Sequence, residues 1–186
     1  MEAAIQCVET MGIDATTTRK IAEIAGVNSA AINYYFRAKE ALLDRVLAAT
    51  TENAIGDWER AMADPALPPR ERLRTMLLQM LNGSIAFPNL TRAHVQGPAM
   101  EGNYDTIFVR RFRSFVVAAR DTLAQAYPNT RVQDVELRLM SLFLATLGFC
   151  LLGGMFQDFS TANLEQQEAR DRYVDFLLEK LAGEGP

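Results

Sequence analysis

Residues 15–43 are the part of the sequence that most restricts how this chain can fold. They read as a short amphipathic helix, a tight turn, a second short helix and the start of a third. Hydroxyls at Thr16, Thr17 and Thr18 can cap the first helix. Gly26 then ends it, because glycine tolerates the left-handed conformation of a helix C-terminus. The spacing therefore predicts two short helices joined by a tight turn.

The second short helix is expected to have one apolar side and one polar or small side, and Asn28 or Ser29 can cap it. Its inward residues should be Ala31, Ile32 and Phe36. Its outward residues should be Ser29, Ala30, Asn33 and Tyr34. Short hydrogen-bonding groups on such a helix can approach base edges in a major groove, and a phenol can reach a phosphate. The pattern therefore predicts a recognition helix.

This stretch resembles the DNA-binding domain of the TetR family of bacterial transcriptional regulators. The residues that carry the resemblance are Gly12, Thr16, Thr17, Ile21, Ala22, Ala25, Gly26, Val27, Tyr34, Tyr35, Phe36, Lys39 and Glu40. It implies an all-α fold, with a three-helix helix-turn-helix head over residues 1–47 and a helical effector-binding and dimerisation body over residues 48–186. Asn33 departs from the family, which most often has tyrosine there. A glycine-turned helix pair that serves packing alone is the alternative.

The residues expected to bind DNA are Thr17, Thr18, Arg19, Asn28, Ser29, Ala30, Asn33, Tyr34 and Lys39. Among them, Arg19 and Lys39 should contact phosphates. Ser29, Asn33 and Tyr34 should set register and readout. The formal net charge of -4 and the pI near 5.1 exclude a broadly basic protein surface. The DNA surface must therefore be local. In the family the first helix starts earlier, behind a basic arm, so here either the start is trimmed or the arm is absent.

The hydrophobic pattern predicts further helices over residues 2–11, 39–62, 70–87, 104–127, 135–156 and 162–181. Prolines and glycines in residues 88–103 predict no more than a short helix, over residues 90–95. The last helix is expected to turn Tyr173, Phe176, Leu177 and Leu181 inward. The chain is thus expected to be helical throughout.

Residues 139–157 contain no charged side chain. The length of this uncharged run reaches the range of membrane-spanning helices. Ser141, Thr146 and several glycines dilute the run, so we interpret it as a helix buried on most sides. The resemblance implies that it joins the last helix in a homodimer interface, for which the candidates are Leu144, Leu147, Leu151, Met155, Tyr173 and Leu177. A monomer core is the alternative.

Three phenylalanines of residues 104–127 fall on one stripe of the helix, with Arg111 at its edge. Together with other apolar side chains they form the candidate effector site: Met76, Met80, Phe108, Arg111, Phe112, Phe115, Phe143 and Phe149. Such a wall suits an apolar ligand whose acidic group meets Arg111. The alternative is a solid core in which Arg111 pairs with a nearby carboxylate.

Catalytic and metal-binding patterns are missing from the sequence. Cys7 and Cys150 are far apart, and His94 is the single histidine, so we expect free thiols in a reducing cytoplasm, a structural histidine and no metal site. Glu165 and Glu168 fit a solvated helix face. We therefore expect a cytoplasmic homodimeric repressor that binds double-stranded operator DNA and an unknown, hydrophobic effector. We expect no enzymatic activity, no cofactor and no binding to a membrane. The alternative is an all-helical small-molecule-binding protein or enzyme whose N-terminal helices are only scaffold.

Overall fold

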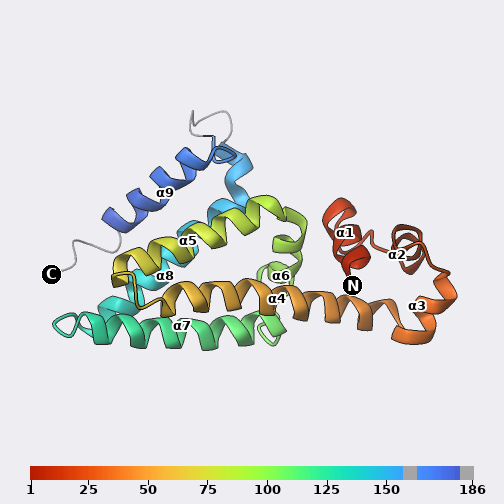
Figure 1. Ribbon diagram of the computed structural model, residues 1–186, viewed down its shortest axis with the longest axis horizontal. Helices are drawn as coiled ribbons and strands as arrows, with labels where there is room; N and C mark the ends of the chain where they lie inside the picture. Colours follow the sequence, from red (N-terminus) through yellow and green to blue (C-terminus); the bar gives the residue numbers. More distant parts are fainter. Residues whose placement is uncertain (157–162, 181–186) are drawn as a thin grey trace. The chain divides into compact units, whose positions relative to one another are not determined.

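The computed structural model describes residues 1–156 and 163–180, and within these ranges all regular structure is helical (Figure 1). The helices are α1 (Glu2–Met11), α2 (Thr18–Ala25), α3 (Ser29–Phe36), α4 (Lys39–Ala63), α5 (Pro69–Ala86), α6 (Pro88–Met100), α7 (Ile107–Ala126), α8 (Val132–Leu152), the short 3-10 helix η1 (Gly153–Phe156) and α9 (Gln167–Lys180). The all-α prediction is confirmed. Leu181, expected inward, lies outside the described residues.

The chain divides into two compact units. The first unit consists of Met1–Asn53 and Phe87–Arg111, and the second of Ala54–Ala86 and Phe112–Pro186. The first unit thus contains the predicted head, residues 1–47, together with α6, which the sequence had assigned to the body. Each unit has its own buried apolar residues.

Capping residues set the two short helices of the first unit. The Thr17 hydroxyl accepts a hydrogen bond from the Lys20 N–H at 3.2 Å and caps α2, as predicted. Gly26 ends α2 with φ 65°, in the left-handed region. Of the two candidate caps of α3, the structure selects Asn28, whose side-chain oxygen accepts from the Ala30 N–H at 2.8 Å. The turn between α2 and α3 is therefore held by local chemistry visible in the sequence.

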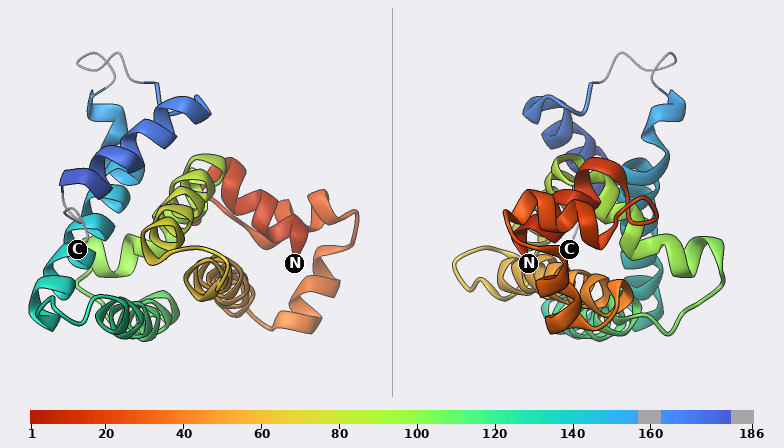
Figure 2. Two further views of the ribbon diagram at one scale, coloured as in Figure 1. Left: turned by 60° about the vertical axis from the view of Figure 1, so that its left-hand side comes forward. Right: turned by 90° about the vertical axis from the view of Figure 1, so that its right-hand side faces the viewer.

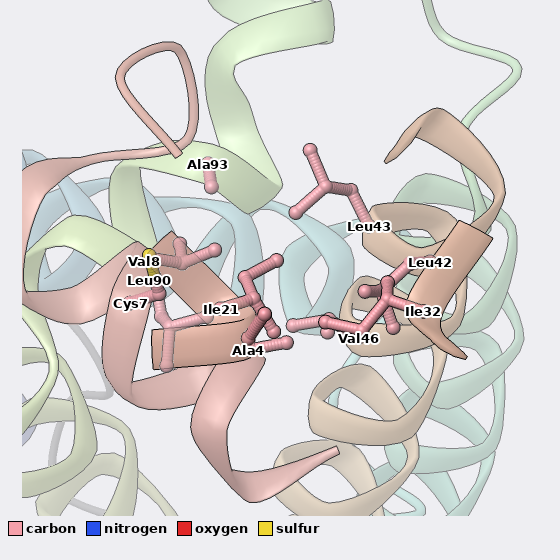
Figure 3. Packing of buried hydrophobic residues seen from close by; sticks show 11 residues of the cluster. Ala4, Cys7, Val8, Ile21, Ile32, Leu42, Leu43, Val46, Leu90 and Ala93 are labelled. Atoms are coloured by element: carbon pink, nitrogen blue, oxygen red, sulfur yellow. The ribbon is translucent and has the colours of Figure 1, made fainter. Parts of the chain in front are cut away.

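The core of the first unit is built from five helices (Figure 3). Its buried side chains are Ala4, Cys7 and Val8 of α1, Ile21 and Ala22 of α2, Ile32 of α3, Leu42, Leu43 and Val46 of α4, and Leu90 and Ala93 of α6. The predicted inward residue Phe36 packs against this cluster, whereas Ile24 is exposed. The contribution of α6 was not expected.

Helix α6 corrects the prediction of a short helix over residues 90–95. It begins with Pro88 at its first position, where a missing N–H costs nothing, and continues through Pro98 to Met100. Pro98, in the last turn, has no N–H to donate to the His94 carbonyl, and the helix ends two residues later. The Gly97 carbonyl there accepts from the N–H groups of Glu101 and Asn103 at 3.1 and 2.9 Å, which closes the helix end.

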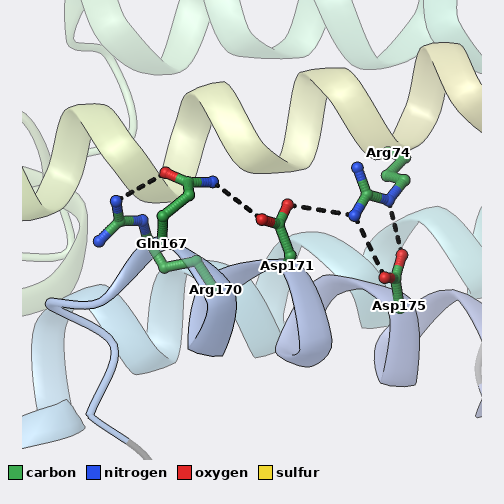
Figure 4. A network of polar contacts seen from close by, with 5 residues as sticks. All are labelled: Arg74, Gln167, Arg170, Asp171 and Asp175. Carbon is green, nitrogen blue, oxygen red and sulfur yellow. Dashed lines mark hydrogen bonds and ion pairs between the residues drawn. The ribbon is translucent and has the colours of Figure 1, made fainter.

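In the second unit, α5 buries the predicted face and packs against α8 and α9 (Figure 2). An ion-pair network fixes α9 on α5 (Figure 4). Arg74 Nε lies 2.6 Å from an Asp175 oxygen, and its Nη2 lies 3.1 Å from an Asp171 oxygen. The hydrogen bond from Arg74 lowers the pKa of the Asp175 carboxyl below its usual value. The apolar contacts between these helices are thus supplemented by fixed charge pairs.

Helix α8 was expected to be buried on most sides, and this is wrong for the single chain. Residues 132–156 are long and apolar enough to cross a membrane by length and composition, yet only 22% of the most apolar window is buried. One face of α8 packs inward through Leu139, Leu142 and Phe143, and the opposite face stays exposed. Phe176 of α9, predicted inward, is also exposed. Two apolar surfaces therefore remain uncovered in the described part of one chain.

Two glycines give a matched test of the turn between α2 and α3. An added Cβ would meet nothing within 4 Å at Gly26 or at Gly83, but only Gly26 has a positive φ. We expect Gly26→Ala to lower the free energy of unfolding by about 1–2 kcal/mol through backbone strain. Gly83→Ala, inside α5, should instead raise it by about 0.5–1 kcal/mol. Urea unfolding followed by circular dichroism measures both, and equal effects would contradict the assignment of the turn.

Candidate nucleic-acid interface

Helix α3 presents a polar and aromatic surface to solvent. Ile32 is buried and anchors one side, whereas Ala30, Asn33 and Tyr34 are exposed and Ser29 is half-buried. Tyr34 is 82% exposed. The predicted outward residues thus lie on the solvent side of a short helix whose other side is packed. This is the geometry that a helix needs to enter a groove of DNA.

Tyr35 and Arg37 are further exposed residues beside the predicted contacts. The sequence predicted Arg37 as part of a local basic surface with Arg19, Lys20 and Lys39, and Tyr35 only as part of the family resemblance. Tyr35 is 76% exposed, and its ring meets the ring of Tyr34 edge-on, with 5.5 Å between centroids. Arg37 follows α3 with φ 57°, a conformation that disfavours a residue with a side chain. The paired tyrosines were visible in the sequence, but the backbone conformation of Arg37 had no sequence signal because glycine or asparagine is usual there.

Several predicted DNA-binding residues have a second, structural task. The side chains of Thr17 and Asn28 are used as helix caps, and Thr16 is fully buried with its hydroxyl donating to the Gly12 carbonyl at 2.8 Å. Thr18 is half-buried at the first position of α2. These residues therefore hold the N-termini of α2 and α3 in place, and the positive ends of helices favour phosphate groups.

The basic side chains near these helices are accessible. Arg19 and Arg37 are exposed, and Lys39 is half-buried at the first position of α4. Lys20 forms an exposed pair with Glu23, with 3.1 Å between Nζ and the carboxylate oxygen. An exposed pair of this kind contributes little free energy, about 0–1 kcal/mol, so a phosphate can replace Glu23 as the partner of Lys20.

The candidate effector residues are divided between the two units. In the second unit, Met76, Met80, Phe115 and Phe143 are buried. Phe112 packs edge-on against Phe143 with 5.1 Å between ring centroids, and Phe149 packs instead against Tyr173 at 5.2 Å. These six residues therefore take part in the packing of the second unit. Phe108 and Arg111 belong to the first unit.

Arg111 has a carboxylate partner within the chain. Its Nε lies 2.8 Å from a Glu52 oxygen, in a pair that is half-exposed to solvent. This is the arrangement that the sequence left open as the alternative to an effector contact. Phe108 lies beside the ring of His94, with 5.5 Å between centroids. His94 also contacts the hydroxyls of Thr50 and Thr51, so its predicted structural role agrees with its contacts.

The candidate dimer residues fall into two groups. Leu144 and Met155 are 66% and 75% exposed, and Leu147 and Leu151 are half-buried. By contrast, Leu177 is buried inside its own chain, and the Tyr173 hydroxyl donates to the Ala145 carbonyl at 3.0 Å. The exposed face of α8 also includes Leu137 and Met140, which lie two turns and one turn before Leu144. Leu177 therefore positions α9 rather than lining a surface.

Both cysteines are free thiols, as expected. Cys7 is buried, and burial raises the pKa of the Cys150 thiol, which keeps it protonated at neutral pH. Within the described ranges, no three His, Cys, Asp or Glu side chains are grouped so that they could hold a metal ion. The chemistry that the described site offers is therefore hydrogen bonding and charge.

Comparison with known proteins agrees with this geometry. Residues 1–46 match the family model of bacterial regulatory proteins of the tetR family. No curated protein sequence matches the chain. Among solved structures, the TetR family transcriptional regulator PfmR from Thermus thermophilus is 19% identical, with a TM-score of 0.63 over 100% of this chain and 98% of that chain.

Two further structures contain ligands. The transcriptional regulator FadR from Bacillus subtilis, in complex with stearoyl-CoA, is 19% identical, with a TM-score of 0.63 over 100% of this chain and 96% of that one. A TetR variant from Acinetobacter baumannii AYE, in complex with minocycline, is 21% identical, with a TM-score of 0.59 over 95% and 90%. Residues 1–46 are therefore a TetR-type DNA-binding domain, and the chain has the fold of TetR-family regulators.

Proposed function

We propose that this chain is a ligand-responsive, DNA-binding transcriptional regulator, a repressor that a small apolar effector releases from its operator. The observation that carries the proposal is α3, which combines a buried anchor at Ile32 with exposed Asn33 and Tyr34 at its surface. Asn and Tyr side chains can hydrogen-bond base edges and phosphates in the major groove. The partner is double-stranded DNA, and the site of action is the cytoplasm.

A homodimer follows from the same function. One eight-residue helix in one groove offers little surface, and two heads on half-sites about 34 Å apart supply enough for specific binding. The exposed apolar face of α8 and η1, from Leu137 through Leu144 to Met155, is the surface that a second copy would cover. Phe176 adds exposed apolar area on α9. Burial of these side chains against the same face of a second chain would remove them from water.

The effector is proposed from the second unit's apolar interior and from the ligands of similar structures. The stearoyl-CoA and minocycline complexes contain ligands with large apolar parts, and this chain has methionine and phenylalanine side chains at Met76, Met80 and Phe115. Methionine makes such walls adaptable. Binding of an effector to one conformation in preference to another would shift the population away from the DNA-binding state.

The competing function is a small-molecule-binding protein or enzyme in which α1 to α3 are only scaffold. A mobility-shift assay on fragments of the source genome separates the two functions, because a scaffold head would not select any fragment. Sequencing of the fragments that bind would then give the operator. The exposed tyrosine pair favours the regulator, since scaffold helices gain nothing from two large side chains in water.

The first prediction of this function separates base contacts from phosphate contacts. Asn33→Ala should change the preference among operator variants, at a cost of about 1–3 kcal/mol for the preferred base pair. Lys39→Ala should weaken binding to all sequences alike and reduce the slope of log K against log salt by about 1. Fluorescence anisotropy at several salt concentrations measures both. If Asn33→Ala and Tyr34→Ala leave operator binding unchanged, α3 is not the recognition helix.

The second prediction concerns the α8 face. Leu144→Glu should give a monomer that has lost specific DNA binding, because an unpaired charge in a dry interface costs several kcal/mol. Val117→Glu, at an exposed apolar position of α7, is the matched control and should leave association unchanged. Multi-angle light scattering measures the mass of each protein. A monomeric wild type would contradict the dimer.

The third prediction concerns Arg111. If an acidic effector replaces Glu52 as its partner, hydrophobic acids should raise the Tm of the wild type more than that of Arg111→Ala. Glu52→Gln should bind the same acids more tightly, because it removes the competing carboxylate. A thermal-shift screen of fatty and aromatic acids tests all three proteins. Equal stabilisation of wild type and Arg111→Ala would remove Arg111 from the effector site.

A further inference from the structure

Helix α6 is packed into the DNA-binding unit although it is distant from it in the sequence. Leu90 and Ala93 of α6 are buried in the same cluster as Ala4 and Val8 of α1 (Figure 3). Helices α1 and α6 pack against each other. Because the apolar cluster that supports α2 and α3 includes these two side chains, displacement of α6 would expose apolar surface in the DNA-binding unit.

Glu9 of α1 caps the N-terminus of α6 from outside that helix. Its two carboxylate oxygens accept hydrogen bonds from the Asn89 and Leu90 N–H groups at 3.2 and 3.0 Å. The Asn89 side-chain amide donates to the Glu9 carbonyl at 2.7 Å, so the contact runs both ways. Phe87, at the N-cap position of α6, supplies no side-chain cap. A carboxylate at this end of a helix satisfies two orphan donors and meets the positive end of the helix dipole.

His94 links α6 to α4 by a second polar contact. Thr50 Oγ1 lies 3.0 Å from Nε2 of His94 and 2.8 Å from the Val46 carbonyl oxygen, and Thr51 Oγ1 lies 3.3 Å from Nδ1. Thr51 is fully buried. When the Thr50 hydroxyl donates to the Val46 carbonyl, it accepts from Nε2–H, and Nδ1 then accepts from the Thr51 hydroxyl. This arrangement uses the neutral imidazole.

The chain enters the first unit at Phe87 and leaves it again after Arg111. A segment of the second unit therefore precedes α6 directly, and another follows it after residues 101–111. The proposed effector residues Met76, Met80 and Phe112 belong to these two segments. Glu9 and His94 are the polar side chains that tie α6 to α1 and α4.

We propose that Glu9 and His94 are positioning residues for operator binding: they fix α6 as a structural element of the DNA-binding unit, and loosening either contact lowers operator affinity without touching the DNA surface. The proposal rests on the proposed DNA-binding function. In this proposal, the position of α6 determines whether the DNA-binding unit keeps the conformation that binds the operator. Glu9 acts through the α1 contact, and His94 acts through Thr50 and Thr51 of α4.

For Glu9→Gln, a purely electrostatic effect and a positioning effect predict opposite changes in operator affinity. Removal of a negative charge strengthens binding to DNA if only electrostatics matter. If Glu9 positions α6, Glu9→Gln should instead weaken operator binding by about tenfold, because the amide replaces one of the two accepting oxygens by an NH2 group, which only donates. Glu2→Gln, an exposed carboxylate in the same helix, is the matched control and should bind equally or slightly more tightly. Salt dependence should keep the wild-type slope in Glu9→Gln, since no phosphate contact is lost.

The protonation of His94 reports on its contacts with Thr50 and Thr51. The charged side chains on the packed elements include Glu52 of α4 and Arg111 of α7, which pair with each other. Arg92 of α6 bonds the Asn89 side chain, and Glu9 of α1 bonds backbone N–H groups. Burial lowers the pKa of His94 to about 4. The neutral form is thus favoured in the folded state above the unfolded pKa, and this preference is lost as the pH falls from about 6.5 towards 4.

His94 is the single histidine of the sequence, so the imidazole NMR signals of the untagged protein need no assignment. We expect the Nε2–H tautomer and titration near pH 4 in the wild type. Thr51→Val keeps the shape but removes the donor to Nδ1, so the pKa of His94 should rise and operator affinity at pH 7 should fall by about fivefold. Thr51→Ser retains the hydroxyl and should restore both values.

All variants are compared at a temperature where thermal unfolding shows them to be folded. Weaker binding by Glu9→Gln and Thr51→Val, with Glu2→Gln and Thr51→Ser like the wild type, supports the proposal. Wild-type affinity in Glu9→Gln and Thr51→Val overturns it while the DNA-binding function stands. A wild type that selects no genomic fragment contradicts the proposed function itself, and with it any role of Glu9 and His94 in operator binding.

Discussion

Helix α3, the proposed recognition helix, cannot hold its own conformation, and the rest of the first unit compensates for this. Helix α3 has eight residues, fewer than an isolated helix needs to be stable in water. Its position depends on burial of Ile32 beside Leu42 and Val46 of α4, on the Asn28 cap and on the Gly26 turn. A surface that must match a DNA groove is thus supported from behind by a small apolar cluster. Because that cluster includes Leu90 and Ala93, the precision of α3 depends on α6.

The second unit presents the opposite situation, a helix with more apolar surface than its own chain covers. Helix α8 packs one face on α5 and α9 and leaves Leu137, Met140 and Leu144 exposed. Exposed apolar stripes of this length are uncommon on monomers and typical of interaction surfaces. In the proposed dimer, the same surface that lowers solubility in the single chain would fix the distance between two heads. The ion pairs of Arg74 with Asp171 and Asp175 hold α9 on α5.

The sequence predicted features whose cause is local and missed those whose cause is distant. Thr17, Gly26 and the inward Ile32 follow from capping, backbone freedom and helical spacing, and all were found. The length of α6 was missed because proline is expected to break a helix, whereas this helix continues for two residues beyond Pro98. The Glu9 cap joins residues that are far apart in sequence, so no periodicity could indicate it. The exposure of Phe176 was missed for the same reason, since helical spacing alone does not show which neighbour a face meets.

The pair formed by Arg111 and Glu52 indicates where the affinity of an acidic effector would have to come from. A half-exposed pair contributes about 0–1 kcal/mol, and replacement of one carboxylate by another changes the Coulomb energy little. The net affinity of an acid at Arg111 would therefore come from burial of its apolar part, at about 25 cal/mol per Å2. Displaced Glu52 is adjacent in α4 to Thr51, the donor to His94. In the proposed mechanism, the effector contact at Arg111 and the contact that fixes α6 would therefore meet at consecutive residues of α4.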